Sequence, residues 1–222
     1  MEEKALQINP EMARRCLQSA HLYIETNRFR EALKLLDEVI ESHQPQNLDA
    51  HLESARIYAK FKRSNSILKV INHLHGFSPK TPESMVLLAR AQFLSGQYEA
   101  CGQTLGEIFI QRRDFPEGVA LEAELCLYTG KYEAAIDKFE SLNLRYPKNY
   151  NYLTLLALAH YANGRYHRTI SICTTIMKAG FADPKVTKLY EMSKRKKRVE
   201  ALGKLRKVKP LKIGRASCRE RV

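Results

Sequence analysis

The stretch AELCLYTGKYEAAIDKFESLNLRYP, residues 123–147, decides the fold, because shifting it along the chain by a fixed period recovers much of the remaining sequence. It opens with the small residue Ala123, reaches Gly130 seven positions later, and places Tyr132 two positions further on. Self-similarity with a period of about 20 to 50 residues is the signature of a stacked repeat. The chain is therefore predicted to be an array of similar units.

The register recurs five times along the chain. The small residue of each unit returns at spacings of 35, 34, 34 and 34 residues, at Ala20, Ala55, Ala89, Ala123 and Ala157. Four of the five units also carry an aromatic residue nine positions later. In the second unit Ser64 takes that position, and Lys62 stands where three other units have glycine. We therefore expect a looser turn in the second unit.

Each unit is predicted to contain two helices. In the fourth unit Ala135, Phe139 and Leu142 follow the turn at intervals of four and three residues, which places them on one helix face. The other units repeat this pattern. Because proline suits a helix boundary, prolines between the units support their separation. They are Pro45, Pro79, Pro116, Pro147 and Pro184.

The motif G-x-Y-x-x-A in GKYEAA, with an alanine before it and a proline after it, resembles the tetratricopeptide repeat. The resemblance covers roughly residues 1–183. It implies an all-α fold, a right-handed superhelical solenoid of antiparallel helix pairs. The expected order is the end of a truncated preceding repeat at 1–12, five repeats, and a capping helix with a basic tail at 184–212. The five repeats are expected at about 13–47, 48–81, 82–115, 116–149 and 150–183.

The last ten residues, IGRASCRERV at 213–222, match the translation of a common sequencing adapter, and we interpret them as an assembly artefact. Without them four cysteines remain, and none of these forms a C-x-x-C pair. They are interpreted as packed thiols, which favours a reducing compartment. The sequence has no apolar run near the roughly 18 residues that a membrane-spanning helix needs. We expect a cytoplasmic protein, with the nucleus as the alternative.

Positive charge is concentrated near the C-terminal end. Residues 184–222 hold fifteen Lys and Arg against three acidic residues, whereas residues 1–183 hold 22 against 21. Such a block is typical of contact with nucleic acid, anionic lipid or acidic protein, or of a nuclear address. The alternative is the solvated end of a capping helix, where cations are favoured. The centre of the block is Lys194, Arg195, Lys196, Lys197 and Arg198.

Signals for catalysis are weak. His73 and His75 are two positions apart, so on a helix they point in different directions and do not share a metal. The chain has no phosphate loop, nucleophile elbow or H-E-x-x-H helix. We expect no enzyme, no cofactor, and no catalytic or metal-binding residue.

The resemblance also implies where a partner binds, because the first helices of such repeats line a concave groove. We expect a protein or peptide partner with acidic residues opposite the basic part of this groove and an apolar or aromatic anchor opposite its later part. The expected lining is Leu17, His21, Ile24, Leu52, Arg56, Lys60, Val86, Arg90, Phe93, Glu124, Leu127, Tyr128, Leu158 and Tyr161.

Two classes of function compete at this point. The first is a non-enzymatic scaffold or adaptor that binds a partner segment in the groove. The second is a regulatory segment of a larger protein, such as an enzyme. Association with nucleic acid through the basic tail is a third alternative, which a strong dependence of affinity on salt would reveal.

Overall fold

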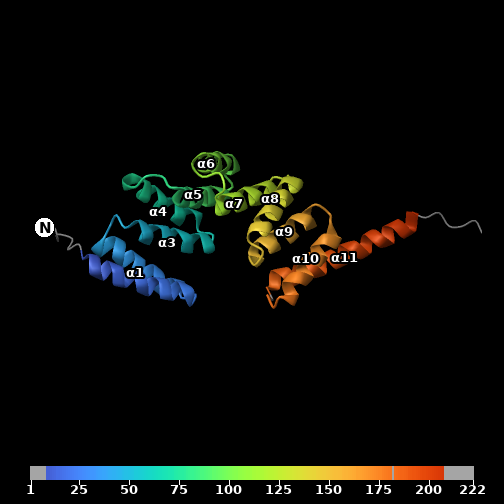
Figure 1. The fold of residues 1–222 in the computed structure, drawn as a ribbon, viewed down its shortest axis with the longest axis horizontal. Coiled ribbons are helices and arrows are strands. Elements are labelled where there is room, and N and C mark those ends of the chain that lie inside the picture. The colour runs from blue at the N-terminus through green and yellow to red at the C-terminus, as the bar shows by residue number, and fades with distance from the viewer. Residues whose placement is uncertain (1–8, 182, 208–222) are drawn as a thin grey trace, which may run out of the picture. The chain divides into compact units, whose positions relative to one another are not determined.

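The computed structural model describes residues 9–181 and 183–207. Within these ranges the chain forms eleven α-helices and one π-helical turn, η1, and no strand (Figure 1). The expected all-α fold with a terminal helix is confirmed. Two sequence expectations fall outside the described residues: the start of the truncated repeat, at 1–8, and the adapter-like segment at 213–222. The same holds for the end of the basic tail, at 208–212.

The helices fall into two compact units, which are described separately. The first unit ends at Lys131 and the second begins at Tyr132. The first holds α1 (Pro10–Glu25), α2 (Phe29–Glu38), η1 (Val39–His43), α3 (Leu48–Lys60), α4 (Ser64–Phe77), α5 (Pro82–Leu94), α6 (Tyr98–Gln111) and α7 (Pro116–Tyr128). The second holds α8 (Tyr132–Arg145), α9 (Tyr150–Ala162), α10 (Tyr166–Lys178) and α11 (Pro184–Lys207).

Polar caps begin the first helix of several repeats. The side chain of Asn9 accepts a hydrogen bond from the backbone N–H of Met12 at 3.1 Å, and Asn47 does the same for Ala50 at 2.9 Å. Thr81 forms a reciprocal capping box at the start of α5. These side chains satisfy N–H groups that have no partner inside the helix. These capping side chains therefore determine the residues at which the helices begin.

The turn inside each helix pair uses one residue in the left-handed conformation. Gly96 has φ +77°, and Lys62 reaches +56° at the equivalent position of the second repeat. The N–H of Lys62 donates to the carbonyl of Ala59 at 3.0 Å, just as the N–H of Gly96 donates to Phe93 at 3.1 Å. The expected looser turn is therefore wrong. The same backbone hydrogen bonds close both turns. The left-handed backbone conformation of Lys62 costs about 1 kcal/mol of conformational free energy.

The alanine row lies where helices approach most closely. Ala20, Ala55 and Ala89 are buried in the first unit, and Ala157 is buried in the second. Larger apolar residues of the second helices fill the space beside them, as Leu36 does next to Ala20 in the core of the first repeat. Small residues allow the two helices of a pair to pack tightly.

The terminal helix α11 packs on the second unit through its first turns. Val186 and Leu189 are buried against α9 and α10, in a cluster that includes Ala157 and Cys173. Beyond the buried Ser193 the helix continues to Lys207, with residues 195–199 exposed; it is drawn in orange and red in Figure 1. Among the helices that the structure describes, none has both the length and the apolar composition needed to span a bilayer.

Candidate functional site

The predicted groove residues lie on α1, α3, α5, α7 and α9, and nearly all of them reach the surface. Leu52 does not, because it is 8% exposed and packs against Ala55 and Ile71 in the core of the first unit. Leu158 and Tyr161 belong to the second unit. We call the remaining set the first-helix face: Leu17, His21, Ile24, Arg56, Lys60, Val86, Arg90, Phe93, Glu124, Leu127 and Tyr128.

An ion pair links α5 to α7 in the middle of the first-helix face. The Nη1 and Nη2 atoms of Arg90 donate to the two carboxylate oxygens of Glu124, at 2.6 and 2.9 Å. The two residues are 34 apart, so they occupy the same position of successive repeats. The side chains are only 28% and 22% exposed. Arg90 was expected to face an acidic partner, but its charge is already matched within the chain.

An aromatic cluster lies next to this ion pair at the ends of α5 and α7. The ring centroids of Phe93 and Tyr128 are 5.3 Å apart, and Tyr98, from α6, is 5.7 Å from each. Tyr128 is 69% exposed, so a large part of its ring is open to solvent. Such separations are typical of edge-to-face and tilted aromatic pairs, which hold one another in place. The cluster is a preformed apolar platform.

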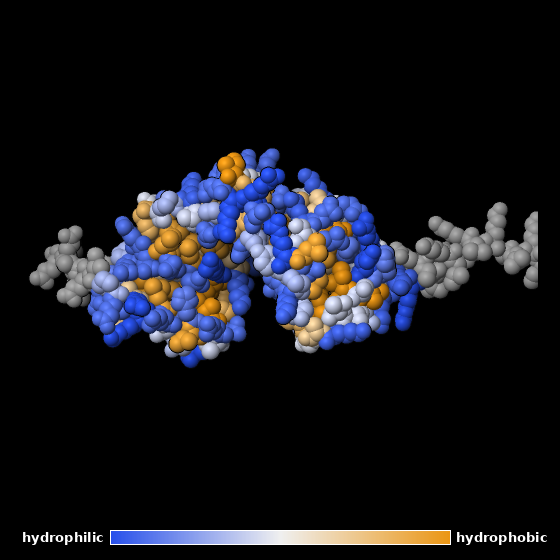
Figure 2. Space-filling view, viewed as in Figure 1, coloured by the Kyte–Doolittle hydropathy of each residue, from blue (hydrophilic) through white to orange (hydrophobic). Residues whose placement is uncertain are grey.

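The basic side chains of the first-helix face are less free than the sequence indicates. The ammonium group of Lys60 lies 4.1 Å from the centre of the Phe29 ring and 3.4 Å from Oδ1 of Asn27. Arg56 contacts Glu53 one turn earlier on α3, and its side chain is 53% exposed. Glu53 is only 16% exposed, so its carboxylate depends on this contact, but Arg56 has five N–H donors and reaches solvent, so it can meet a second carboxylate without releasing Glu53. Figure 2 shows apolar patches set among hydrophilic side chains on the visible face of each unit.

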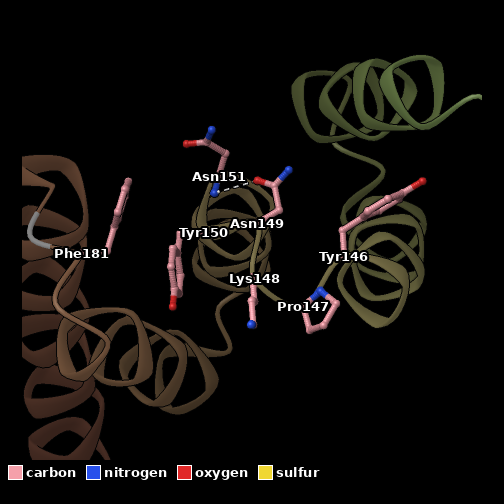
Figure 3. A pocket seen from close by; sticks show the side chains of 7 residues that line it. All are labelled: Tyr146, Pro147, Lys148, Asn149, Tyr150, Asn151 and Phe181. Atoms are coloured by element: carbon pink, nitrogen blue, oxygen red, sulfur yellow. Dashed lines mark hydrogen bonds between the residues drawn. The ribbon is translucent and has the colours of Figure 1, made fainter. Parts of the chain in front are cut away.

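The second unit presents two smaller features. Tyr161 packs against Tyr166 with ring centroids 5.5 Å apart, beside the exposed Leu158. A separate open hollow of about 600 Å³ lies between the loops before α9 and α11 (Figure 3). In it the rings of Tyr150 and Phe181 stack at 5.3 Å. No motif in the sequence predicts a hollow at this place.

The basic block predicted from the sequence lies on α11, beyond the part that packs on the second unit. Lys194 places its ammonium group 4.5 Å from the centre of the Tyr190 ring. The next four residues, Arg195 to Arg198, are all exposed. Five consecutive cations on a helix point in every direction around its axis, so a polyanion can reach some of them from any side.

The buried titratable groups are not arranged for catalysis. Burial raises the pKa of both Cys101 and Cys173 to about 11, so these thiols stay protonated at neutral pH. Burial lowers the pKa of His51 and of His160, so both rings are neutral at that pH. These groups behave as parts of the core.

Comparison with known proteins identifies the repeats. The tetratricopeptide repeat family matches residues 3–45 and, again, residues 121–168. A search of curated protein sequences finds no match.

Solved structures share the fold at low sequence identity. A tetratricopeptide repeat protein from Parabacteroides merdae is 16% identical, with a TM-score of 0.67 over 95% of this chain and 82% of that one. The thermophilic TPR protein TTC0263 from Thermus thermophilus is 14% identical, with a TM-score of 0.70 over 82% of this chain and 98% of that one. A chain of the APC/C hetero-tetramer Cut9–Hcn1 is 15% identical, with a TM-score of 0.75; the match covers 87% of this chain and 38% of that one.

The matches to solved structures concern the fold. The two family matches identify the type of repeat. Together they show that the chain contains tetratricopeptide repeats at residues 3–45 and 121–168 and shares its fold with solved proteins built from such repeats.

Proposed function

We propose that the chain is a non-enzymatic scaffold that holds an extended segment of a partner protein on its first-helix face. Repeats of this family generally serve in protein–protein interaction, and the Cut9–Hcn1 match comes from a protein assembly. The observation that carries the proposal is the aromatic cluster of Phe93, Tyr98 and Tyr128. It exposes apolar area that packing within the first unit does not cover.

The cluster favours a partner with an apolar or aromatic anchor. Exposed aromatic residues that are held rigidly lose little side-chain entropy on binding, and Tyr is enriched among the residues that dominate binding energy. Arg56 and the His21 end of the face favour acidic residues further along the same segment. Because Arg90 already pairs with Glu124, we place the acidic contact at Arg56.

A peptide library displayed against the immobilised full chain tests this proposal. For the peptides recovered, Tyr128→Ala should weaken binding by about 2 kcal/mol or more at any salt concentration. Arg56→Glu should weaken binding strongly at low salt and less at high salt, because charges at a rim act mainly through screened attraction. Affinities come from titration calorimetry with each synthetic peptide.

Tyr146→Ala is the matched control, since Tyr146 is also an exposed tyrosine, at 42%, but lies in the second unit. It should leave the affinity unchanged. Circular dichroism checks that each variant is folded. If folded Tyr128→Ala and Phe93→Ala variants keep wild-type affinity for every recovered peptide, the aromatic cluster is not the binding surface.

A second candidate function is association with nucleic acid or another polyanion through α11. The basic block from Lys194 to Arg198, in which the last four residues are exposed, favours it. Replacing all five residues by Gln should abolish retention on heparin at physiological salt and leave the melting temperature nearly unchanged, since surface substitutions usually change stability by under about 0.5 kcal/mol. Unchanged retention would leave the block as the solvated end of a capping helix.

A regulatory segment within a larger protein stays a prediction, as does the cytoplasmic location. The cytoplasmic location is supported by three buried thiols in the described part of the chain, Cys16, Cys101 and Cys173. In an oxidising compartment thiols tend to form disulfides.

A further inference from the structure

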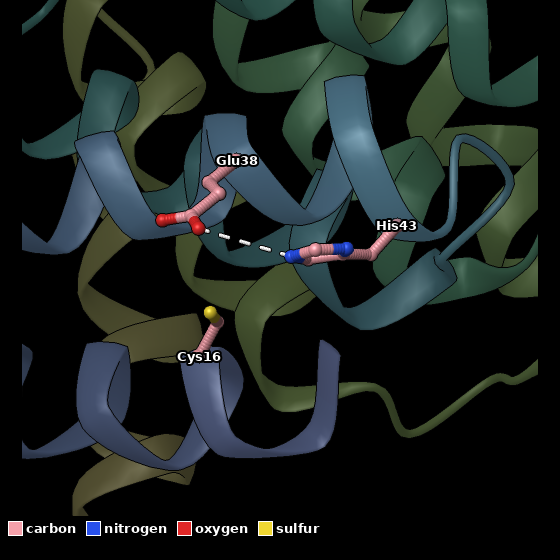
Figure 4. Close-up of side chains that lie close together, drawn as sticks. All are labelled: Cys16, Glu38 and His43. Carbon is pink, nitrogen blue, oxygen red and sulfur yellow. Dashed lines mark ion pairs between the residues drawn. The ribbon is translucent and has the colours of Figure 1, made fainter. Parts of the chain in front are cut away.

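Three side chains with metal-binding atoms meet inside the first repeat (Figure 4). Cys16 comes from α1, Glu38 ends α2, and His43 ends the π-helical turn η1. The sulfur, one carboxylate oxygen and one ring nitrogen all lie within 4.8 Å of one another. They approach from two sides of the contact between α1 and the end of α2.

The π-helical turn is what brings Glu38 and His43 together. Residues five apart on an α-helix point about 140° away from each other, because each residue turns the helix by about 100°. The wider turn of η1, closed by the N–H of Gln44 donating to the carbonyl of Val39 at 2.7 Å, brings both side chains to one face. Short π-helical turns of this kind occur frequently at functional sites.

His43 has no hydrogen-bond partner for either ring nitrogen, and both nitrogens are buried. Its Nε2 atom lies 3.8 Å from Oε1 of Glu38, which is too far for a hydrogen bond. A buried polar group without a partner costs free energy, so such a group in a folded protein needs an explanation. A cation between the three side chains would give the imidazole a partner.

We propose that Cys16, Glu38 and His43 bind a divalent transition metal ion, with Zn²⁺ the best match. Thiolate, imidazole and carboxylate together suit Zn²⁺ or Co²⁺, whereas Mg²⁺ and Ca²⁺ prefer oxygen ligands alone. Glu38 is 50% exposed, which gives the ion a path from solvent and leaves room for a water molecule as the fourth ligand.

The bound ion would change the first repeat in two ways. Tetrahedral bonds of about 2.0 to 2.3 Å require the ligand atoms to be roughly 3.5 Å apart, so the side chain of Glu38 rotates inward by a small amount. Cys16 would release its proton to solvent as its sulfur bonds to the ion, although burial and the nearby Glu38 raise the pKa of the free thiol. The ion would then tie α1 to the end of α2.

Co²⁺ added to the metal-free full chain is the direct probe, because Co²⁺–thiolate bonds absorb in the near ultraviolet. One equivalent should produce this charge-transfer band in the wild-type protein and not in Cys16→Ser. His43→Gln and Glu38→Gln should each lower Co²⁺ affinity tenfold or more, since even residues behind the ligands commonly contribute that much. Zn²⁺ should displace Co²⁺ and raise the melting temperature of the wild type in a concentration-dependent way.

Cys173→Ser and His167→Gln are the matched controls. Cys173 is a buried thiol that belongs to no group of potential metal ligands among the described residues, and His167 is an exposed histidine. Both variants should bind Co²⁺ as the wild type does.

Two spectroscopic results would overturn the proposal. One is the absence of a charge-transfer band with excess Co²⁺, and the other is an unchanged band in Cys16→Ser, which would assign the thiolate elsewhere. Because Glu38 lies at the surface, Glu38→Gln keeps the fold even if Cys16→Ser does not. Wild-type affinity in that variant would also exclude the three-ligand site.

Discussion

Substitution of Arg90 and Glu124, singly and together, should show that the pair stabilises the contact between α5 and α7. The two hydrogen bonds are short, and about three quarters of each side chain is buried. Exposed ion pairs contribute roughly 0.2 to 1 kcal/mol, whereas hydrogen bonds to charged groups contribute about 1.5 to 3 kcal/mol. This largely buried geometry lies between these cases, so we expect a coupling free energy of about 1.5 kcal/mol.

The assay is a double-mutant cycle with Arg90→Met, Glu124→Gln and the double variant, measured by urea unfolding followed by circular dichroism. Each single change leaves a half-buried charge without its partner, so each should destabilise the protein by about 2 kcal/mol. The double variant should be more stable than the sum of the single changes predicts. The coupling should persist in high salt, because salt screens a partly buried pair weakly.

The pair formed by Arg112 and Glu83 is the control within the same unit. It joins the same residue types, but at 3.3 Å in one hydrogen bond and with side chains 57% and 38% exposed. Its coupling should be below about 0.5 kcal/mol and should vanish in high salt. Equal couplings for the two pairs would refute the argument from burial, and no coupling at Arg90 would leave its guanidinium available to a partner.

Two further predictions concern the backbone and pH. Gly96→Ala should lower the free energy of unfolding by about 1 kcal/mol, because Gly96 has a left-handed φ. Gly106→Ala should raise that free energy by a similar amount, because Gly106 lies inside α6 and the added Cβ has no neighbour within 4 Å. Urea titration of both variants measures the two changes. Burial lowers the pKa of His51 below its ordinary value of 6.5, so as the pH falls this histidine is protonated more readily in the unfolded chain than in the folded one. The free energy of unfolding should therefore decrease as the pH is lowered from about 7.5 to about 5.5. The same titration at each pH tests this, and His51→Gln should reduce the difference.

The sequence predicts the helix pairs well because the same signal occurs many times in phase. One glycine before an aromatic residue would mean little, but rows of alanine and apolar residues at constant spacing constrain every unit at once. The second turn shows the limit of this reasoning. Lys62 breaks the residue pattern, yet hydrogen bonds such as that from Arg63 to Tyr58, at 2.9 Å, give it the common backbone conformation. In this turn the backbone hydrogen bonds hold Lys62 at a positive φ, although a residue with a side chain favours a negative one.

The side-chain partners of the site were harder to predict. Arg90 and Glu124 hold equivalent positions of adjacent repeats, so their opposite charges were a usable signal. Tyr98 was recognised only as the repeat's aromatic residue, and its contact with Tyr128 depends on how α6 meets α7. Glu38 and His43 gave no signal, because five-residue spacing places them on different faces of an ordinary α-helix.

The Arg90–Glu124 pair also constrains what the first-helix face can recognise. A ligand carboxylate at Arg90 would have to displace Glu124, leaving two acidic groups close to one cation in a half-buried position. That arrangement is unfavourable because like charges repel strongly where water is partly excluded. At Arg56 no exchange is needed, because this side chain is 53% exposed and its remaining N–H donors can meet a ligand carboxylate while Glu53, only 16% exposed, keeps its contact. If the proposed function holds, we therefore expect a partner segment whose acidic residue lies one repeat away from its apolar anchor, because the anchor would contact the aromatic cluster at the end of α5 and the acid would reach Arg56 on α3.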